Sequence, residues 1–214
     1  MKAKFIRDLD IDKVERAILD NKFIKAVKDN NISLVEELLE NNVDPSMKDN
    51  WAICWISEKG SLEMFNMIIK DDRIDPSARG NEPIQRACKK GRLIILRSLL
   101  NDKRVDPSAN DNYPLLVACR NGYTEVVKEI LKDKRVNPSS RENWPIILAS
   151  TNGYLDIVDI LMGYDMVDPS TKNNEALRWA FYNGHLDIVK RLLKSKKVRN
   201  KLTLSQKIEF ENLL

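Results

Sequence analysis

The residues of this chain that could carry acid–base or metal chemistry are few and far apart. His185 is the only histidine, and the three cysteines, Cys54, Cys88 and Cys119, form no CxxC pair. Acid–base catalysis and zinc binding need such side chains grouped at short, defined spacings. The sequence also has no GxxxxGK[ST], GxGxxG, HExxH or GxSxG motif. We therefore expect no enzyme activity, no cofactor and no bound metal.

The composition is that of a globular protein of modest charge. Its 214 residues are 43% hydrophobic, and 36 basic against 32 acidic residues give a formal net charge of +4. So weak a charge gives little reason to expect a polyanionic partner. No apolar run approaches the roughly 18 residues of a membrane span, and Asp8, Asp10 and Asp12 interrupt the start, where a secretory signal would need an apolar core. We expect a monomer in the cytoplasm that has buried thiols and no disulfides.

One short sequence motif, here called the DPS word, recurs with a fixed period. A branched apolar residue followed by Asp or Asn, Pro and Ser occurs every 31 residues, starting at Val43, Ile74, Val105, Val136 and Val167. A glycine column has the same period, at Gly60, Gly91, Gly122, Gly153 and Gly184. So does an asparagine column, at Asn50, Asn81, Asn112, Asn143 and Asn174. A fixed period of this length indicates stacked structural repeats.

Each repeat has the pattern of two short helices. Pro114 is tolerated in the first helical turn because its missing N–H would be unpaired there anyway. Gly122 ends this helix, since glycine enters left-handed conformations at little cost. Thr124–Lys132 then places its apolar residues on one side, as in an amphipathic helix. Neither helix can bury its apolar face alone, so the copies must stack.

The aligned columns resemble the ankyrin repeat. The pattern N-x-P-[LI]-x-x-A-x-x-x-G-[HY]-x-[ED]-[VI]-V-x-x-[IL]-L is evident in Asn112–Leu131 and Asn174–Leu193, and a degenerate copy without the Pro and Gly runs over Phe23–Asn42. The resemblance implies an all-α solenoid of stacked helix-turn-helix units with short fingers between repeats. The usual ankyrin unit has about 33 residues and a TPLH sequence. This chain lacks both, so the β-hairpin fingers are either fully formed or shortened, and a shortened finger suits the two missing residues.

The repeats predict three regions. Residues 1–20 form an N-terminal helical cap, residues 21–202 the repeat domain, and residues 203–214 a C-terminal capping helix. The six predicted repeats are residues 21–47 (degenerate), 48–78, 79–109, 110–140, 141–171 and 172–202. Asp12 with Glu15, and Thr203 with Gln206, have the spacing of N-terminal capping boxes. Terminal repeats need such caps because an open apolar face would aggregate.

The resemblance implies that a partner protein binds a concave face formed by the first helices and the finger tips. Carried onto this chain, the aromatic and basic residues of that face are Trp51, Lys59, Lys89, Lys90, Tyr113, Arg120, Trp144 and Tyr182, with Arg79 and Arg141 at finger tips. Such residue types often carry binding energy. Trp51, Tyr113 and Trp144 are equally suited to bracing the fingers. Trp55 and Trp179 fit half-buried packing better, and His185 fits a structural place after the turn glycine.

A basic run near the C-terminus supports a second hypothesis. It contains Lys190, Arg191, Lys194, Lys196, Lys197, Arg199 and Lys201, with no acidic residue among them. A solvated helix edge is the simplest interpretation. Nuclear import, an acidic partner and nucleic acid are the alternatives, of which nucleic acid is disfavoured because interleaved aromatic residues are missing. The DPS-type repeat also resembles ankyrin proteins of large amoeba-infecting DNA viruses and some protists, which implies a virus-encoded adaptor directed at host proteins.

Overall fold

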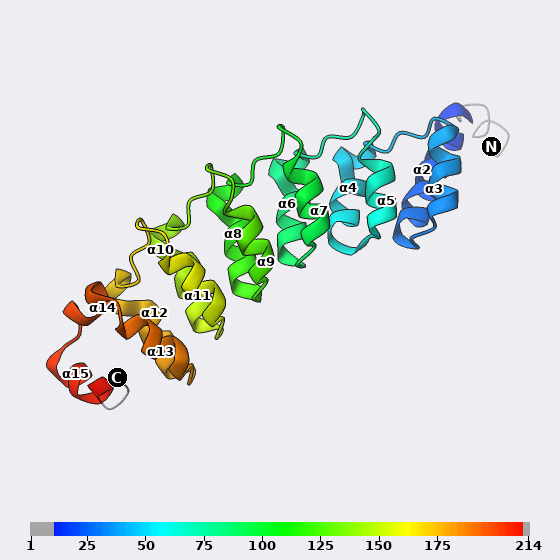
Figure 1. The fold of residues 1–214 in the computed structure, drawn as a ribbon. Helices are drawn as coiled ribbons and strands as arrows, with labels where there is room; N and C mark the ends of the chain where they lie inside the picture. Colours follow the sequence, from blue (N-terminus) through cyan, green and yellow to red (C-terminus); the bar gives the residue numbers. More distant parts are fainter. Residues whose placement is uncertain (1–10, 212–214) are drawn as a thin grey trace, which may run out of the picture. The chain divides into compact units, whose positions relative to one another are not determined.

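The computed structural model describes residues 11–211 and consists of helices joined by turns (Figure 1). No strand occurs between residues 11 and 211, which confirms the predicted all-α class. The chain divides into two compact units, unit 1 (Met1–Pro83) and unit 2 (Ile84–Leu214). Within the described range no helix is both long and apolar enough to cross a lipid bilayer.

The helices follow one another in pairs, one pair to each repeat. Those of unit 1 are α2 (Ile11–Lys28), α3 (Ile32–Glu40), α4 (Met47–Lys59) and α5 (Leu62–Ile68). The helix α6 (Ala78–Lys89) crosses the boundary between the units. Those of unit 2 are α7 (Leu93–Leu100), α8 (Ala109–Asn121), α9 (Thr124–Ile130), α10 (Ser140–Thr151), α11 (Leu155–Met162), α12 (Thr171–Tyr182), α13 (Leu186–Leu193), α14 (Lys196–Asn200) and α15 (Leu204–Glu211).

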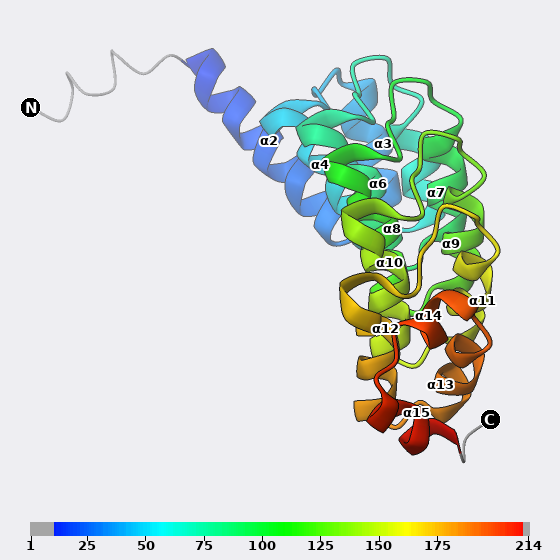
Figure 2. The same cartoon turned by 90° about the vertical axis from the view of Figure 1, so that its left-hand side faces the viewer.

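We call the first helix of each repeat the inner helix and the second the outer helix. In unit 2 the inner helices α8, α10 and α12 form one row, and the outer helices α9, α11 and α13 form another (Figure 2). Each inner helix packs on its own outer helix, and α10 also packs on both α8 and α12. In unit 1, α2 packs on α3 and α4, and α4 packs on α5. Repeats therefore stack within each unit as the period predicts.

The repeated apolar columns form the core of each unit. The outer-helix residues Val126, Val127 and Ile130 are buried, as are Ala118 and Cys119 of the neighbouring inner helix. Full burial of one such aliphatic side chain contributes roughly 1.5–3 kcal/mol. Gly122 is left-handed at φ +75° directly after α8, so it ends the helix as predicted.

The DPS word builds a turn held by its own side chains. Val105 is fully buried, and the Asp106 carboxylate accepts hydrogen bonds from the Ser108 N–H at 2.9 Å and the Ser108 hydroxyl at 2.7 Å. Both bonds recur in Asp44–Ser46, Asp75–Ser77, Asn137–Ser139 and Asp168–Ser170. The aspartate or asparagine is thus an acceptor for the backbone two residues on, as in an Asx-turn.

The fingers are short turns without a strand between residues 11 and 211, which excludes full β-hairpins there and agrees with the shortened finger. Near the starts of α4, α6, α8, α10 and α12 three consecutive residues have left-handed φ and ψ angles, for example Asn110, Asp111 and Asn112 at φ +53°, +56° and +61°. The Asn112 N–H donates to the Ser108 carbonyl at 2.8 Å and closes the turn. For residues other than glycine this conformation costs roughly 1–2 kcal/mol each. Such a turn therefore needs stabilising contacts from outside itself.

The next repeat supplies those contacts. The Asn112 side-chain oxygen accepts a hydrogen bond from the Asn137 N–H at 2.7 Å, and Asn143 does the same for the Asp168 N–H at 2.7 Å. The Arg141 guanidinium donates to the Asn110 carbonyl at 2.6 Å. In unit 1 the equivalent bonds run from the Asp75 N–H to the Asn50 side-chain oxygen and from the Arg79 guanidinium to the Lys48 carbonyl. The asparagine column thus links each repeat to its successor within a unit.

A ring from the following repeat covers the turn glycine. An added Cβ at Gly91 would lie 2.7 Å from the Tyr123 ring, and one at Gly153 would lie 2.7 Å from the His185 ring. His185 also has its Nε2 3.2 Å from the Thr151 carbonyl oxygen. The predicted structural place of His185 is therefore confirmed. The last glycine of the column, Gly184, has φ +76° and open space at its Cβ position.

The two ends differ from the prediction in part. The helix α2 is continuous across residue 20, where we predicted the boundary between cap and first repeat, because the helix runs on into the buried residues Phe23, Ala26 and Val27. Asp12 lies inside α2, and its side chain lies outside the described residues. At the other end the capping box is confirmed: the Thr203 N–H donates to Gln206 Oε1 at 3.0 Å, and the Gln206 N–H to Thr203 Oγ1 at 3.2 Å.

The short helix α14 was not predicted. It and the residue after it supply some of the contacts that a following repeat supplies elsewhere. The Asn174 amide donates to the Val198 carbonyl at 3.1 Å, while the buried Asn174 Oδ1 has no hydrogen-bond partner among residues 11–211. The Lys201 ammonium donates to the Ser170 carbonyl at 3.1 Å. The contacts that complete the last left-handed turn therefore come from residues 198–201.

Replacing Gly153 by alanine should destabilise the protein more than replacing Gly184. Both changes force alanine into a left-handed conformation, which costs about 1 kcal/mol, but only Gly153→Ala also displaces the His185 ring. We expect losses in the free energy of unfolding of about 3 kcal/mol for Gly153→Ala and about 1 kcal/mol for Gly184→Ala. Urea denaturation followed by circular dichroism measures both, and equal losses would contradict the ring-on-glycine contact.

Replacing Asn143 by alanine should lower the free energy of unfolding by about 2–3 kcal/mol, because the Asp168 N–H loses its acceptor and alanine tolerates the left-handed region poorly. Asn143→Asp keeps an acceptor oxygen and a residue suited to this conformation, so it should cost less than half as much. The same denaturation series compares them. If the two variants are equally unstable, the bond to Asp168 is not what stabilises the turn.

Candidate protein-binding surface

The last turns of the inner helices carry exposed side chains. In unit 2 Lys89, Lys90 and Arg120 are exposed at the ends of α6 and α8, and Tyr182 is 73% exposed at the end of α12. They occupy neighbouring positions of the 31-residue period. The stack therefore presents these predicted binding residues at the same end of successive inner helices.

Asparagine side chains hold these helix ends together. The Asn121 amide donates to the Lys89 carbonyl at 3.0 Å, and the Asn183 amide donates to the Thr151 carbonyl at 2.7 Å. Each bond joins the end of one inner helix to the end of the previous one. Helix ends fixed in this way hold their exposed side chains in place before a partner binds.

Tyr113 and Trp144 lie at the opposite ends of the inner helices, next to the left-handed turns. Both are half-buried. The Lys172 ammonium of the next repeat lies 5.0 Å from the centre of the Trp144 ring, and it also pairs with Glu142 at 3.3 Å. Trp144 thus contacts the following turn, as a ring that braces the finger would, and keeps part of its surface exposed.

The predicted finger-tip residues Arg79 and Arg141 bridge repeats. Besides the carbonyl contacts described above, Arg79 Nε lies 3.6 Å from an Asp49 carboxylate oxygen, and Arg141 Nε lies 3.2 Å from an Asp111 carboxylate oxygen. Both guanidinium groups are therefore engaged within their own unit.

Unit 1 contains a compact cluster of aromatic and basic side chains on its inner helices. Trp51 and Trp55 of α4 stack with ring centres 5.4 Å apart and planes inclined by 27°. The Lys28 ammonium lies 5.6 Å from the Trp51 ring centre and 5.9 Å from that of Trp55, and the Lys59 ammonium lies 4.6 Å from that of Trp55. We call these four residues the Trp–Lys cluster. Lys28 was not among the predicted binding residues, although it lies 31 residues before Lys59 and so occupies the same position of the repeat.

Trp179 is more exposed than the half-buried packing predicted for it. Its side chain is 44% exposed, its Nε1 donates to Glu175 at 3.2 Å, and its ring lies edge-on to Tyr182 at 6.2 Å. The end of α15 covers the neighbouring Phe181 through the buried Phe210, at 5.1 Å between ring centres. Trp179 and Tyr182 thus form a second exposed aromatic pair, in unit 2.

The basic run splits into structural and exposed residues. Arg191 pairs with Asp159, Arg199 donates to the Leu193 carbonyl at 2.6 Å, and Lys201 donates to Ser170. Burial raises the pKa of Asp168, but hydrogen bonds from Ser170 and the charges of Lys201 and Lys197 outweigh it, so the pKa lies below its usual value. The exposed remainder consists of Lys190, Lys194, Lys196 and Lys197.

The cysteines are buried, and the described cysteine, histidine and carboxylate side chains do not gather into a metal-binding site. Cys54, Cys88 and Cys119 are buried free cysteines, and burial raises the pKa of the Cys88 and Cys119 thiols far above the usual value. They remain uncharged and serve as small apolar side chains. Residues 11–211 contain no group of three or more His, Cys, Asp or Glu side chains arranged to hold a metal ion.

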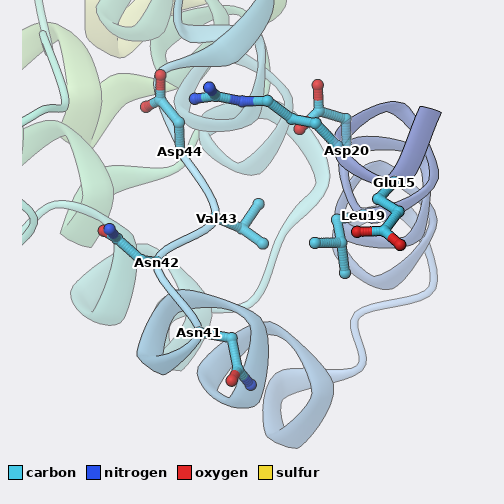
Figure 3. A pocket seen from close by; sticks show the side chains of 8 residues that line it. Glu15, Leu19, Asp20, Asn41, Asn42, Val43 and Asp44 are labelled. Carbon is cyan, nitrogen blue, oxygen red and sulfur yellow. The ribbon is translucent and has the colours of Figure 1, made fainter. Parts of the chain in front are cut away.

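A cavity of about 360 Å³ lies in unit 1 between α2 and the turn after α3. Figure 3 shows Leu19 and Val43 pointing toward each other across it, with Asp20 and Asp44 along one edge and Asn41 along the other. Asp44 already accepts the two hydrogen bonds of its DPS turn from Ser46. Glu15, Arg16 and Asn42 complete a lining that is mostly polar.

Comparison with known proteins agrees with this architecture. A family model described as ankyrin repeats (3 copies) matches residues 23–111, 95–173 and 115–203, which together span most of the chain. No curated protein matches the chain. Paired helices, the 31-residue period and this match lead to one conclusion: the chain belongs to the ankyrin-repeat family.

Proposed function

We propose that the protein is a non-enzymatic binding module that holds a partner protein on the faces formed by its inner helices. Ankyrin repeats are protein–protein interaction modules. The observation that carries the proposal is the set of exposed aromatic and basic side chains on the ends of the inner helices, which include Lys59, Lys89, Arg120 and Tyr182. Side chains of these types contribute much of the energy in protein interfaces.

The binding mechanism is preorganisation. Hydrogen bonds between repeats, such as Asn121 to Lys89 and Asn183 to Thr151, fix the helix ends that carry the binding residues. Less conformational entropy is then lost when the partner docks. Half-buried rings such as Trp144 add apolar contact area that is already ordered.

We further propose that the protein acts in the cytoplasm as a monomeric adaptor, encoded by a virus and directed at proteins of the host. The support is the resemblance of the DPS-type repeat to ankyrin proteins of large amoeba-infecting viruses. Mass spectrometry of proteins captured from the cytosol of the native host cell would identify the partner.

Replacing both Tyr113 and Trp144 by alanine should abolish capture of the partner, because it removes two ordered rings from the inner-helix face of unit 2. The circular dichroism spectrum should remain that of the unaltered protein. Tyr164→Ala is the matched control, since it removes another half-buried ring of unit 2, between α11 and α12. Undiminished capture by the double variant would exclude Tyr113 and Trp144 from the binding surface.

A second candidate function, nuclear import or nucleic-acid binding through the basic edge, has one observation in its favour. Residues 84–214 contain 23 basic and 15 acidic residues, and Lys190, Lys194, Lys196 and Lys197 are exposed. If these four lysines contact phosphates, the logarithm of the DNA-binding constant should fall with the logarithm of salt concentration with a slope of roughly −3.6. Replacing all four by glutamine should remove the dependence, and a flat salt profile of the unaltered protein would rule out nucleic-acid binding.

A further inference from the structure

The Trp–Lys cluster of unit 1 places two ammonium groups beside the same indole ring, that of Trp55. Both lie within 5.9 Å of the Trp55 ring centre, and both lysines are exposed. Each such contact with a ring is worth roughly 0.5–1 kcal/mol at an exposed site. The rings therefore restrict the two lysine side chains, and their ammonium groups lose less freedom when they bind an anion.

The two ammonium groups keep their hydrogen-bonding capacity. Among residues 11–211 no ion pair or hydrogen bond joins Lys28 or Lys59 to a carboxylate. The adjacent Asp29 pairs instead with Lys25, at 3.5 Å. A carboxylate from outside the chain would thus meet two donors that are already in place.

The same column has a different use in unit 2. In unit 2 this column begins with Lys90 and continues with Asn121, Asn152 and Asn183. The Asn121 and Asn183 amides donate to main-chain carbonyls of the previous inner helix at 3.0 and 2.7 Å and so tie helix ends together, whereas the Asn152 amide donates to the Leu148 carbonyl of its own helix at 2.8 Å. In unit 1 the Lys28 and Lys59 ammonium groups instead lie near the indole rings of Trp51 and Trp55.

We propose that the Trp–Lys cluster is the docking point for an acidic segment of the partner protein. A carboxylate of that segment lies between the Lys28 and Lys59 ammonium groups, and a neighbouring apolar side chain packs on the exposed parts of Trp51 and Trp55. This assignment rests on the proposed protein-binding function and names the chemistry of the partner at this site.

The charge of unit 1 favours such a segment over nucleic acid. Residues 1–83 contain 13 basic and 17 acidic residues, so a long polyanion would be repelled by the unit as a whole. A single carboxylate interacts mainly with the two nearby ammonium groups, because exposed charges farther apart than about 8–10 Å are screened. The stacked indoles also shield each other from bases, which would need an open ring face.

Selection from a phage library of random dodecapeptides tests the proposal. The protein should enrich peptides in which Asp or Glu stands next to an apolar residue. Lys28→Gln combined with Lys59→Gln should lose this preference and weaken binding of the most enriched peptide by about tenfold or more. Lys70→Gln, an exposed lysine change elsewhere in unit 1, should leave both unchanged. Lys28→Glu combined with Lys59→Glu should enrich basic peptides instead.

Several outcomes would overturn the assignment. Enrichment of peptides without acidic residues would leave the protein-binding function intact and refute the acidic segment. Unchanged enrichment in the double glutamine variant would also refute it, as would binding of single-stranded poly(dT) that depends on the two lysines. An empty selection together with no protein captured from a lysate would instead refute the protein-binding function itself. Circular dichroism confirms that each variant is folded.

Discussion

The stack depends on a left-handed turn that no repeat can stabilise alone. Three left-handed residues in a row cost several kcal/mol, and the turn closes with one main-chain hydrogen bond, such as Asn112 to Ser108. The compensating bonds come from the following repeat, whose backbone N–H donates to the asparagine and whose arginine donates to the turn carbonyls. Because these partners lie 25 to 31 residues away in sequence, the period is a condition of the fold.

The same constraint creates the binding surface. A fixed period places the ends of successive inner helices side by side within a unit, and the asparagine amides of α8 and α12 hold those ends together. The other side chains at these ends contribute little to the stack, so they can vary. Arginine, tyrosine and lysine occupy such positions, and the lysines of the Trp–Lys cluster are an example.

The helices and the core followed from the sequence because they rest on repeated local signals. The glycine column marks helix ends, and the branched residue of each DPS word is buried. The left-handed turns could not be foreseen, because Arg141 and Glu142 do not favour that conformation locally and adopt it through contacts with neighbouring repeats. The roles of the basic edge were missed for the same reason: Arg199 and Lys201 carry the charge of an exposed edge in sequence, yet their partners are carbonyls brought close only by folding. Lys28 was missed because its repeat lacks the proline and glycine that identify the others.

The contacts between repeats run in one direction. In each pair the later repeat supplies the contact. It provides the N–H that donates to the Asn143 side chain, the guanidinium that donates to the Asn110 carbonyl, and the ring that covers Gly153. A ribosome releases the chain from its N-terminus, so each repeat emerges with an unsupported turn and is completed only when its successor has left the exit tunnel. Folding during translation therefore lags one repeat behind synthesis, and the last turn is completed when Val198 and Lys201 emerge.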